Sequence, residues 1–446
     1  MAKTKTVTIA IIALLVLASA GIGSYTLMNK STDDDKVIET GRLVIYGNAN
    51  NDDYLDDRDV QFIQNILDGA VWDESKYPFA DTDTNGKIEQ NDIDLLKKFI
   101  NKESAKMFYY GSTGKVLSIS YPITGNLAVN FSYGLDVAII LGCYDRVTVV
   151  DNQTKGTDNK YPGLSEKTNV GDPRDDAEAM INEVKNNNVK AVFGYDGSRI
   201  SKIVSNVENG GAHIDGIQLT FNHITGKGCD KYGSILTLGI MLGCEEQAYK
   251  FVKYVDKIID YLVDKNPTQK TYVMPEYEEE AYGSATSTWI MTTNRDSTWT
   301  SGANNTVEYL NLKDVYANQF SDGFIEIPLE DIETKNPDVI LLCSWGVVTE
   351  DMTEAEMKEA LKGFFKQYEG CAAYEKGNVY VITYEAYGTI GGIAGTVLLG
   401  SYIWPELYDE EKGWKLLQEY YDDYTLMDVN VKELPTLSPF KLSDSN

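Results

Sequence analysis

Apolar and polar positions divide the chain into an N-terminal apolar run, a short repeated helical unit and a long stretch of alternating strands and helices. Apolar residues three and four apart follow residue 59 and again follow residue 92, which is the spacing of one helix face. They are Val60, Ile63, Ile66 and Leu67 in the first copy, and Ile93, Leu96, Phe99 and Ile100 in the second. The repeat predicts a small all-α module that is separate from the rest of the chain.

Beyond residue 106, short apolar runs typical of strands alternate with amphipathic helical stretches, such as residues 133–141 and 177–186. Alternation of this kind favours an α/β fold with a mostly parallel sheet covered by helices. Strands are predicted at residues 116–120, 147–150, 189–194 and 217–220, and then at 271–274, 324–327, 339–342 and 379–382.

One long helix is predicted between these two sets of strands. Residues 244–265 keep the apolar period of a helix until Asn266 and Pro267 end it. A helix of that length spans roughly 33 Å. The sequence therefore predicts two Rossmann-like lobes that are joined by a single long helix.

The chain begins with a basic segment followed by an apolar run. Lys3 and Lys5 precede residues 7–28, a run of 22 residues that is long enough to cross a bilayer. Small residues at positions 18–20 would also suit the cleavage site of a secretory signal. We favour an uncleaved transmembrane anchor over a signal, and either one places the mature chain outside the cytoplasm.

Two acidic loops precede the two short helices, at residues 48–59 and 81–92. Each spaces oxygen atoms at loop positions 1, 3, 5, 7, 9 and 12, as a calcium loop requires, with a backbone carbonyl at position 7. The predicted calcium ligands are Asn48, Asn50, Asp52, Tyr54, Asp56 and Asp59 in the first loop, and Asp81, Asp83, Asn85, Lys87, Glu89 and Asp92 in the second. Gly86 allows the sharp turn at position 6 of the second loop, whereas Asp53 replaces glycine in the first. We expect a more strained turn at Asp53, so the calcium prediction rests more on the second loop.

A duplicated loop-and-helix unit whose twelve-residue loops end in Asp resembles a type I dockerin, over residues 43–103. The resemblance implies an EF-hand-like module with two calcium sites and a cohesin domain as partner. A solvated acidic surface is the simpler alternative, but the second copy, 33 residues after the first, argues against it.

Charge and motif content exclude several functions. The formal net charge of −28 argues against a nucleic-acid partner, and 30 tyrosines argue against a disordered acidic chain. Phosphate-loop, nucleophile-elbow and HExxH motifs are absent from the sequence, which contains only His213 and His223. We therefore predict that the chain is not an enzyme. The five cysteines give no CxxC pair; Cys143 and Cys343 are expected to be buried, and a bridge between Cys229 and Cys244 stays open.

Several short sequence segments beyond residue 106 resemble the ABC-transporter substrate-binding proteins of the iron-siderophore, haem and vitamin B12 class. They lie at residues 115–122, 135–150, 238–243, 329–340, 376–380 and 404–408, and their order covers nearly all of residues 115–425. The resemblance implies a periplasmic-binding-protein fold of two lobes with a bridging helix. The resulting division is 1–30 signal or anchor, 31–42 spacer, 43–104 calcium module, 106–242 first lobe, 243–266 bridging helix and 268–446 second lobe.

Ligands of such folds bind where the carboxyl ends of strands meet the cleft between the lobes. The positions expected there are Tyr121, Pro122, Tyr195, Asp196, His223, Glu276, Tyr277, Arg295, Trp345 and Tyr384. Aromatic side chains suit a flat or macrocyclic ligand, and Arg295 could pair with a carboxylate or phosphate. His223 could ligate the metal of a haem or corrinoid, although a lone histidine is more often a hydrogen-bonded loop residue.

Two functions follow from these patterns. In the first, the chain is a cell-surface receptor that captures a metal chelate (siderophore, haem or cobalamin) and delivers it to an ABC permease in the membrane. In the second, the dockerin-like module binds a cohesin domain of a partner, and the large domain is attached to the resulting assembly through this module.

Overall fold

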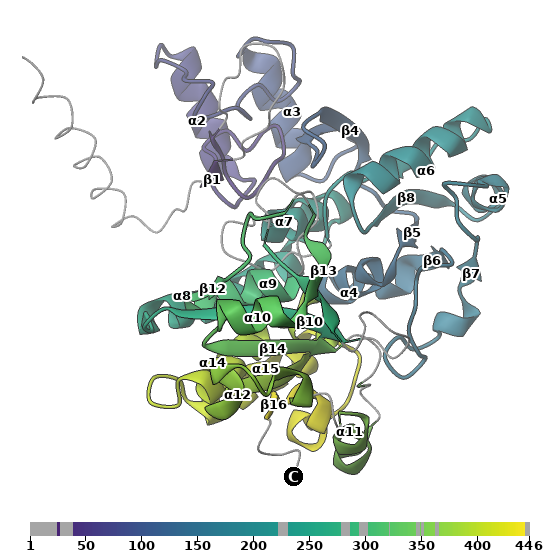
Figure 1. Cartoon of the computed structure of the whole chain (residues 1–446). Coiled ribbons are helices and arrows are strands. Elements are labelled where there is room, and N and C mark those ends of the chain that lie inside the picture. Colours follow the sequence, from purple (N-terminus) through teal and green to yellow (C-terminus); the bar gives the residue numbers. More distant parts are fainter. Residues whose placement is uncertain are drawn as a thin grey trace, which may run out of the picture.

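The computed structural model describes residues 25–26, 39–221, 231–277, 286–293, 302–320, 322–344, 348, 352–361 and 365–441. Figure 1 shows a small helical module, drawn in purple, above two α/β lobes drawn in blue and in green to yellow. Side chains are described from residue 41 onward.

The module is built from the two predicted helices, α2 (Asp57–Leu67) and α3 (Gln90–Ile100). Asp56 caps the start of α2 by accepting from the backbone N–H of Arg58. Ile63, Ile93 and Leu96 form the small core between the helices, as their spacing predicts. Before the module, β1 (Tyr25–Thr26) and β2 (Glu39–Thr40) form an antiparallel pair.

A hairpin connects the module to the first lobe. Its strands are β3 (Ala105–Tyr110) and β4 (Val116–Tyr121). The segment before the first acidic loop lies along β3, because Tyr110 N–H donates to the Val44 carbonyl (2.9 Å) and Tyr46 N–H donates to the Phe108 carbonyl (3.0 Å). The strand predicted at residues 116–120 therefore exists, but its placement in the sheet of the first lobe is wrong.

The first lobe contains a five-stranded parallel sheet with the order β7-β6-β5-β8-β9. Its strands are β5 (Asn126–Asn130), β6 (Val147–Val150), β7 (Thr168–Asn169), β8 (Val189–Gly194) and β9 (Asp215–Gly216). Its helices are α4 (Ser132–Ile140), α5 (Glu178–Asn186) and α6 (Gly197–Asn209). The strand predicted at 217–220 is not found at those residues, because β9 covers only residues 215–216.

The predicted long helix is confirmed as α8 (Glu245–Lys265), which follows α7 (Lys231–Leu242). Asn266 ends it in the left-handed conformation, with φ 39°. Buried residues such as Phe251, Val255 and Ile258 lie at helical spacing along α8. The helix packs against α4 of the first lobe and α14 (Gly392–Ile403) of the second, so it contacts both lobes.

The second lobe contains a mixed sheet with the order β13-β11-β10-β14-β15-β16, and β12 also pairs with β10. Its strands are β10 (Lys270–Tyr277), β11 (Ser287–Met291), β12 (Leu312–Asp314), β13 (Phe324–Pro328), β14 (Val339–Ser344), β15 (Val379–Thr383) and β16 (Phe440–Lys441). The pairs β10–β14 and β14–β15 are parallel, whereas β10–β11, β11–β13 and β15–β16 are antiparallel. Besides α14, its helices are α9 (Gly302–Val307), α10 (Leu329–Lys335), α11 (Glu354–Ala360), α12 (Ala372–Glu375), α13 (Tyr384–Tyr387) and α15 (Glu410–Tyr424).

Within the described residues, no helix has the length and apolar character needed to cross a membrane. The predicted N-terminal anchor, residues 7–28, lies outside the described residues except for the backbone of Tyr25 and Thr26. N-terminal anchoring therefore stays a prediction.

Candidate functional site

The second acidic loop gathers three carboxylates. Asp81, Asp83 and Asp92 each place an oxygen within 4.8 Å of the other two, and no other three His, Cys, Asp or Glu side chains come this close in the described part of the chain. Gly86 has a φ of +86°, as the turn at position 6 requires. Its N–H donates to Asp81 (2.6 Å) and fixes that carboxylate.

Burial of these carboxylates makes a cation favourable here. Loss of hydration raises the pKa of Asp81 and of Asp92, and the negative charge of Asp83 raises both further. A hard dication among the three oxygens would offset both effects. Thr82 next to Asp81 is also buried, and its hydroxyl has no hydrogen-bond partner.

The first loop has the same frame. Its last ligand, Asp59, accepts from the N–H groups of Asn50 (3.1 Å) and Asp56 (2.9 Å). Asp92 accepts in the same way from Asp83 (3.2 Å) and Glu89 (2.8 Å) in the second loop. The two loops are thus copies in structure as well as in sequence.

The ligands themselves differ between the loops. Asn48 is fully buried and its side-chain oxygen has no hydrogen-bond partner, as expected for a calcium ligand. However, the Arg58 guanidinium lies 3.1 Å from Asp52 and 2.8 Å from Asp56, two of the predicted ligands. Burial, with the nearby charges of Asp52 and Asp56, raises the pKa of Asp59 to about 7. The donor set of the second loop therefore fits calcium better than that of the first.

The strain expected at Asp53 is not found. Asp53 is absent from the residues with positive φ, and Asn51 (φ 60°) is the left-handed residue of the first loop. Asp53 instead pairs with Arg42, whose Nε donates to its carboxylate (3.1 Å). The backbone N–H of Tyr54 donates to Asp52 (2.8 Å) and that of Lys87 to Asn85 (2.9 Å), while the carbonyls of both residues stay predicted ligands.

A second candidate site lies at the carboxyl edge of the first-lobe sheet. Phe131 follows β5 and Tyr195 follows β8, so their rings emerge side by side with centroids 4.9 Å apart. Tyr133 lies 5.7 Å from each. The Arg199 guanidinium lies over Tyr195 (4.7 Å) and Phe131 (5.9 Å). We call Phe131, Tyr133, Tyr195 and Arg199 the aromatic–arginine cluster.

The buried carboxylate of Asp151 holds this cluster in place. Asp151, directly after β6, accepts from Phe131 N–H (3.1 Å) and from the hydroxyl of Thr154 (2.7 Å), and it is 1% exposed. Arg199 donates to the side chain of Gln153 in the same loop (2.6 Å). The ends of β5, β6 and β8 are therefore tied together, which holds the rings and the guanidinium in place.

The structure places the predicted first-lobe ligand residues in two different regions. Tyr195 belongs to the aromatic–arginine cluster, and Asp196 caps α6 by accepting from Ser198 (2.8 Å) and Arg199 (2.9 Å). Tyr121 does not lie there: its hydroxyl donates to the Phe99 carbonyl (3.0 Å) and its ring packs on Phe99 of the module. Tyr121 and Pro122 therefore do not follow a strand of the first-lobe sheet, because β4 belongs to the hairpin and not to that sheet.

Less is described of the second-lobe residues. Glu276 is buried near the end of β10, beside Cys343 of β14. The backbones of Tyr277 and Tyr384 end β10 and begin α13, but their side chains lie outside the described residues, as do His223, Arg295 and Trp345 entirely. The ends of β10, β14 and β15 are neighbours in the sheet.

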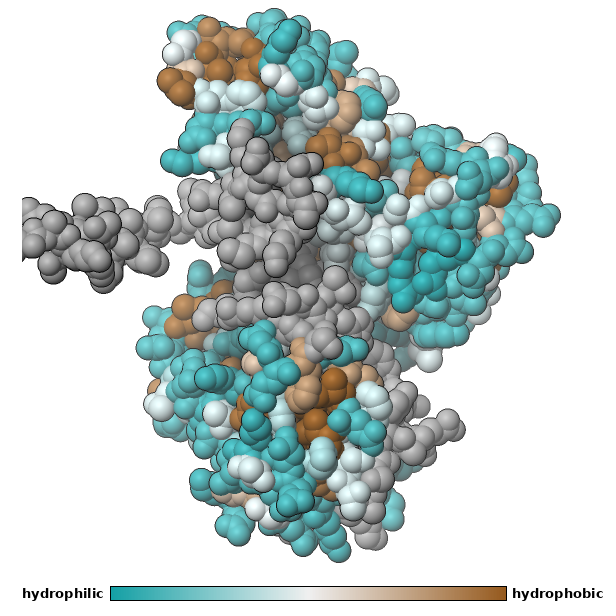
Figure 2. Space-filling model, turned by 45° about the horizontal axis from the view of Figure 1, so that its top comes forward, coloured by the Kyte–Doolittle hydropathy of each residue, from teal (hydrophilic) through white to brown (hydrophobic). Residues whose placement is uncertain are grey.

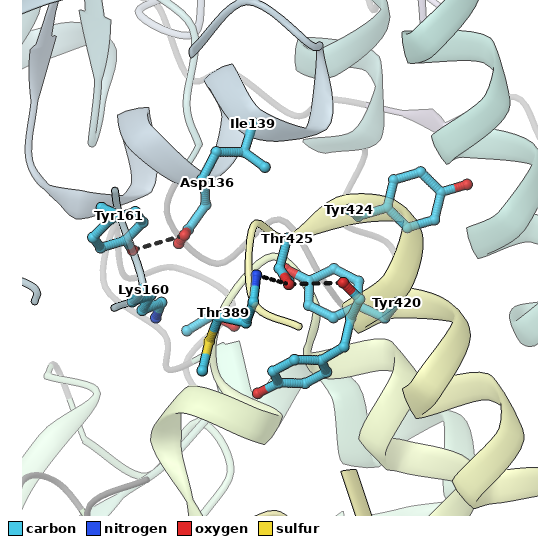
Figure 3. Close-up of a pocket in the computed structure, with 10 residues that line it drawn as sticks. Asp136, Ile139, Lys160, Tyr161, Thr389, Tyr420, Tyr424 and Thr425 are labelled. Carbon is cyan, nitrogen blue, oxygen red and sulfur yellow. Dashed lines mark hydrogen bonds between the residues drawn. The ribbon is translucent and has the colours of Figure 1, made fainter. Parts of the chain in front are cut away.

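A pocket between the lobes is shown in Figure 3. Asp136 and Ile139 of α4, with Lys160 and Tyr161, form its first-lobe side. The second lobe contributes Thr389 together with Tyr420, Tyr421, Tyr424, Thr425 and Met427. Tyr161 donates to Asp136 (2.7 Å), and burial raises the pKa of that carboxyl group. Lys160 and Tyr161 belong to the loop that follows β6, so a loop from the carboxyl edge of the first sheet lines this pocket together with the second lobe.

Four residues of the first-lobe site are not predicted from the sequence: Phe131, Tyr133, Asp151 and Arg199. Asp151 directly follows a predicted strand, so the expectation that ligands bind at the carboxyl ends of strands also applies to it. Phe131 and Tyr133 follow β5, a short strand that begins and ends with asparagine and that the apolar pattern does not predict. Arg199 reaches the site from α6, which only the fold could show.

Comparison with known families agrees with this architecture. Residues 230–386 match the sequence profile of the family described as "Periplasmic binding protein". The match covers α7, α8 and much of the second lobe, which is less than half of the chain. It is a family of binding proteins, which confirms the prediction of a non-enzymatic protein. A search of curated proteins found no match.

Solved structures extend the likeness to both lobes. The TroA-like periplasmic binding protein FepB of Veillonella parvula is 17% identical, with a TM-score of 0.56 over 71% of this chain and 95% of that one. CeuE of Helicobacter pylori with Ni(II) bound is 13% identical, with a TM-score of 0.50 over 74% and 98%. The molybdate-bound periplasmic binding protein MolA of a Haemophilus influenzae ABC transporter is 16% identical, with a TM-score of 0.50 over 71% and 97%. At these identities the likeness shows the fold alone, which is that of a two-lobed periplasmic binding protein.

Proposed function

We propose that the chain is the extracellular substrate-binding component of an ABC importer. The observation that carries this proposal is α8, a single long helix that contacts both lobes, together with the pocket that α4 and residues 160–161 form with the second lobe. The matched family and the solved structures above support the same class. Anchoring through residues 7–28 would keep the receptor beside its permease.

The ligand class that we infer is a metal chelate with a carboxylate or phosphate group: a siderophore, a haem or a corrinoid. The aromatic–arginine cluster offers flat rings for a planar or macrocyclic group, and the Arg199 cation suits its carboxylates. Two of the similar proteins are described with a metal-containing ligand, Ni(II) in CeuE and molybdate in MolA.

Capture would require only a limited movement of the lobes. The α8 helix buries Phe251 and Val255 against neighbouring elements, and a packed helix resists bending more than a pair of extended strands does. The chemistry would be binding and release, and the permease would recognise the ligand-bound arrangement of both lobes.

We further propose that the module at residues 43–104 binds calcium, mainly in its second loop. Asp81, Asp83 and Asp92 would hold the ion, which would neutralise three buried or half-buried carboxylates and add to the stability of the fold. The chain's own part is to preset these oxygens with backbone N–H groups such as that of Gly86.

A cohesin partner is the second candidate function for the same module. Figure 2 shows apolar side chains at the end of the module that is far from the lobes. In this module Leu67, the last residue of α2, is 37% exposed, and Val71 shortly after it is 95% exposed. If this end docks onto a cohesin, Val71→Asp should abolish binding in a pull-down assay and calcium chelation should do the same. Cohesin binding that persists after calcium is chelated would contradict calcium-dependent docking of the module.

The importer proposal is tested by thermal unfolding of the chain with iron siderophores, haem and cobalamin. A ligand at a hundred times its dissociation constant stabilises the folded state by about 2.7 kcal/mol, so a rise of several degrees is expected for one class. Absence of any rise with all three classes would count against the proposal.

A further inference from the structure

The calcium module is packed tightly against the bridging helix and its neighbours. Leu43, Ile45 and Phe99 belong to the same buried core as residues of α7 and α8. Gly233 on α7 lies so close to the chain at Arg42 that a Cβ there would be 2.0 Å from the Arg42 carbonyl oxygen. The module is therefore a fixed part of the body and not a freely hanging domain.

Arg42 links the first calcium loop to α8. Its Nε donates to Asp53 at position 6 of that loop (3.1 Å), and its Nη1 donates to Asp256 on α8 (2.7 Å). The three side chains are half-buried, with 22%, 29% and 39% of their surfaces exposed. Because the guanidinium is planar and bidentate toward both carboxylates, it fixes their relative positions.

Two further contacts follow the same face of α8. The rings of Tyr54 and Tyr249 lie 4.7 Å apart, and Lys102 pairs with Glu245 at 2.5 Å. Residues 245, 249 and 256 are separated by four and seven positions, which places them on one side of a helix. Both halves of the module, loop 1 through Tyr54 and the end of α3 through Lys102, therefore hold this one face.

We propose that the module is a brace on the bridging helix, and that Arg42, through Asp53 and Asp256, couples calcium binding in the module to the order of α8. This coupling gives a function to the replacement of glycine by Asp53, because the Asp53 carboxylate at the turn position of the first loop binds Arg42. This inference rests on the proposed calcium function. It extends that function from adding to the stability of the fold to positioning the helix that contacts both lobes.

Hydrogen exchange of the full chain, with and without calcium, tests the brace. Calcium should slow exchange of the amides over residues 245–256 by about tenfold. Ordering of the first loop would stabilise the contacts that Asp53 and Tyr54 make with this part of the module–helix interface. Arg42→Ala should retain calcium binding by calorimetry but lose this slowing. Asp53→Asn, which keeps the shape of the side chain, should weaken it in the same direction.

Lys257→Ala is the matched control, since Lys257 pairs with Glu419 of α15 (3.0 Å) and not with the module. It should leave the calcium response of α8 intact. Calcium binding without any response of α8, or a full response in both Arg42→Ala and Asp53→Asn, would overturn the brace alone. No calcium binding by the intact chain would overturn the calcium function, and the brace with it.

Discussion

At the residue scale, the two acidic loops share one backbone frame but carry different charges. In the first, Arg58 neutralises Asp52 and Asp56 and the first ligand is the amide Asn48. In the second, Asp81, Asp83 and Asp92 face one another without such a cation among them. The sequence pattern predicted both frames, but the position of the Arg58 side chain depends on rotamers that loop spacing does not determine.

This difference predicts unequal effects of removing one carboxylate from each loop. Asp83→Asn should weaken calcium binding by at least about tenfold, since it removes a charged ligand from the better site. Asp52→Asn, the matched change in the first loop, should have a smaller effect because Arg58 already neutralises Asp52. Calorimetric titration measures both; equal losses would show that the loops bind calcium alike.

Two cysteines show a second residue-scale effect. Cys143 follows α4 and Cys244 precedes α8, and the Cys244 thiol donates to the Leu242 carbonyl (3.7 Å). Interaction with Cys143, with help from the Arg146 cation, lowers the pKa of Cys244, whereas interaction with Cys244 and burial raise the pKa of Cys143. The burial expected for Cys143 and Cys343 is confirmed, while Cys229 lies outside the described residues.

Cys244 should therefore react with iodoacetamide at a lower pH than an ordinary thiol. A lowered pKa means that the thiolate persists as the pH falls below the usual thiol range, so alkylation of Cys244 should exceed that of Cys143 between pH 7 and 8. Peptide mass spectrometry across a pH series follows each residue separately. Comparable labelling of the two thiols would be inconsistent with this assignment.

At the element scale, the strongest periodicity gave the most accurate prediction. The apolar residues of α8 repeat over enough turns to define one helix, and the structure ends it at the predicted Asn266. The strand at β4 was recognised but assigned to the wrong sheet, because alternation shows that a strand exists and not which strand it pairs with. The strand β5, which opens the first-lobe sheet, has only Leu127, Ala128 and Val129 between two asparagines and gave too weak a pattern.

The buried face of α8 predicts a large loss of stability on truncation. Phe251 is fully buried and its ring lies 5.0 Å from that of Tyr424 on α15. Phe251→Ala should lower the free energy of unfolding by about 3–5 kcal/mol, through lost burial and the cavity that remains. Urea unfolding measures the loss. Val263→Ala, at a position of α8 that is 58% exposed, should change it by less than about 0.5 kcal/mol.

At the scale of the whole molecule, the two-lobed plan was predictable and the ligand site only partly so. Alternation of strands and helices and the long helix define the plan, and Tyr195 was placed correctly at a strand end. Phe131 and Arg199 could not be placed, because their proximity depends on the order of β5 and β8 in the sheet. Residues of distant sequence meet at the carboxyl edge only after the topology is known.

The central claim, capture of a metal chelate between the lobes, is tested most directly by calorimetric titration of the intact chain and of Arg199→Ala with iron siderophores, haem and cobalamin. The account predicts that one class binds the intact chain with a stoichiometry of one, and that Arg199→Ala weakens this binding by at least about tenfold through loss of a charge-assisted contact. Lys257→Ala, whose ion pair lies on α8 and α15, should bind as the intact chain does. The absence of binding by every class, or equal affinity of Arg199→Ala and the intact chain, would contradict the account.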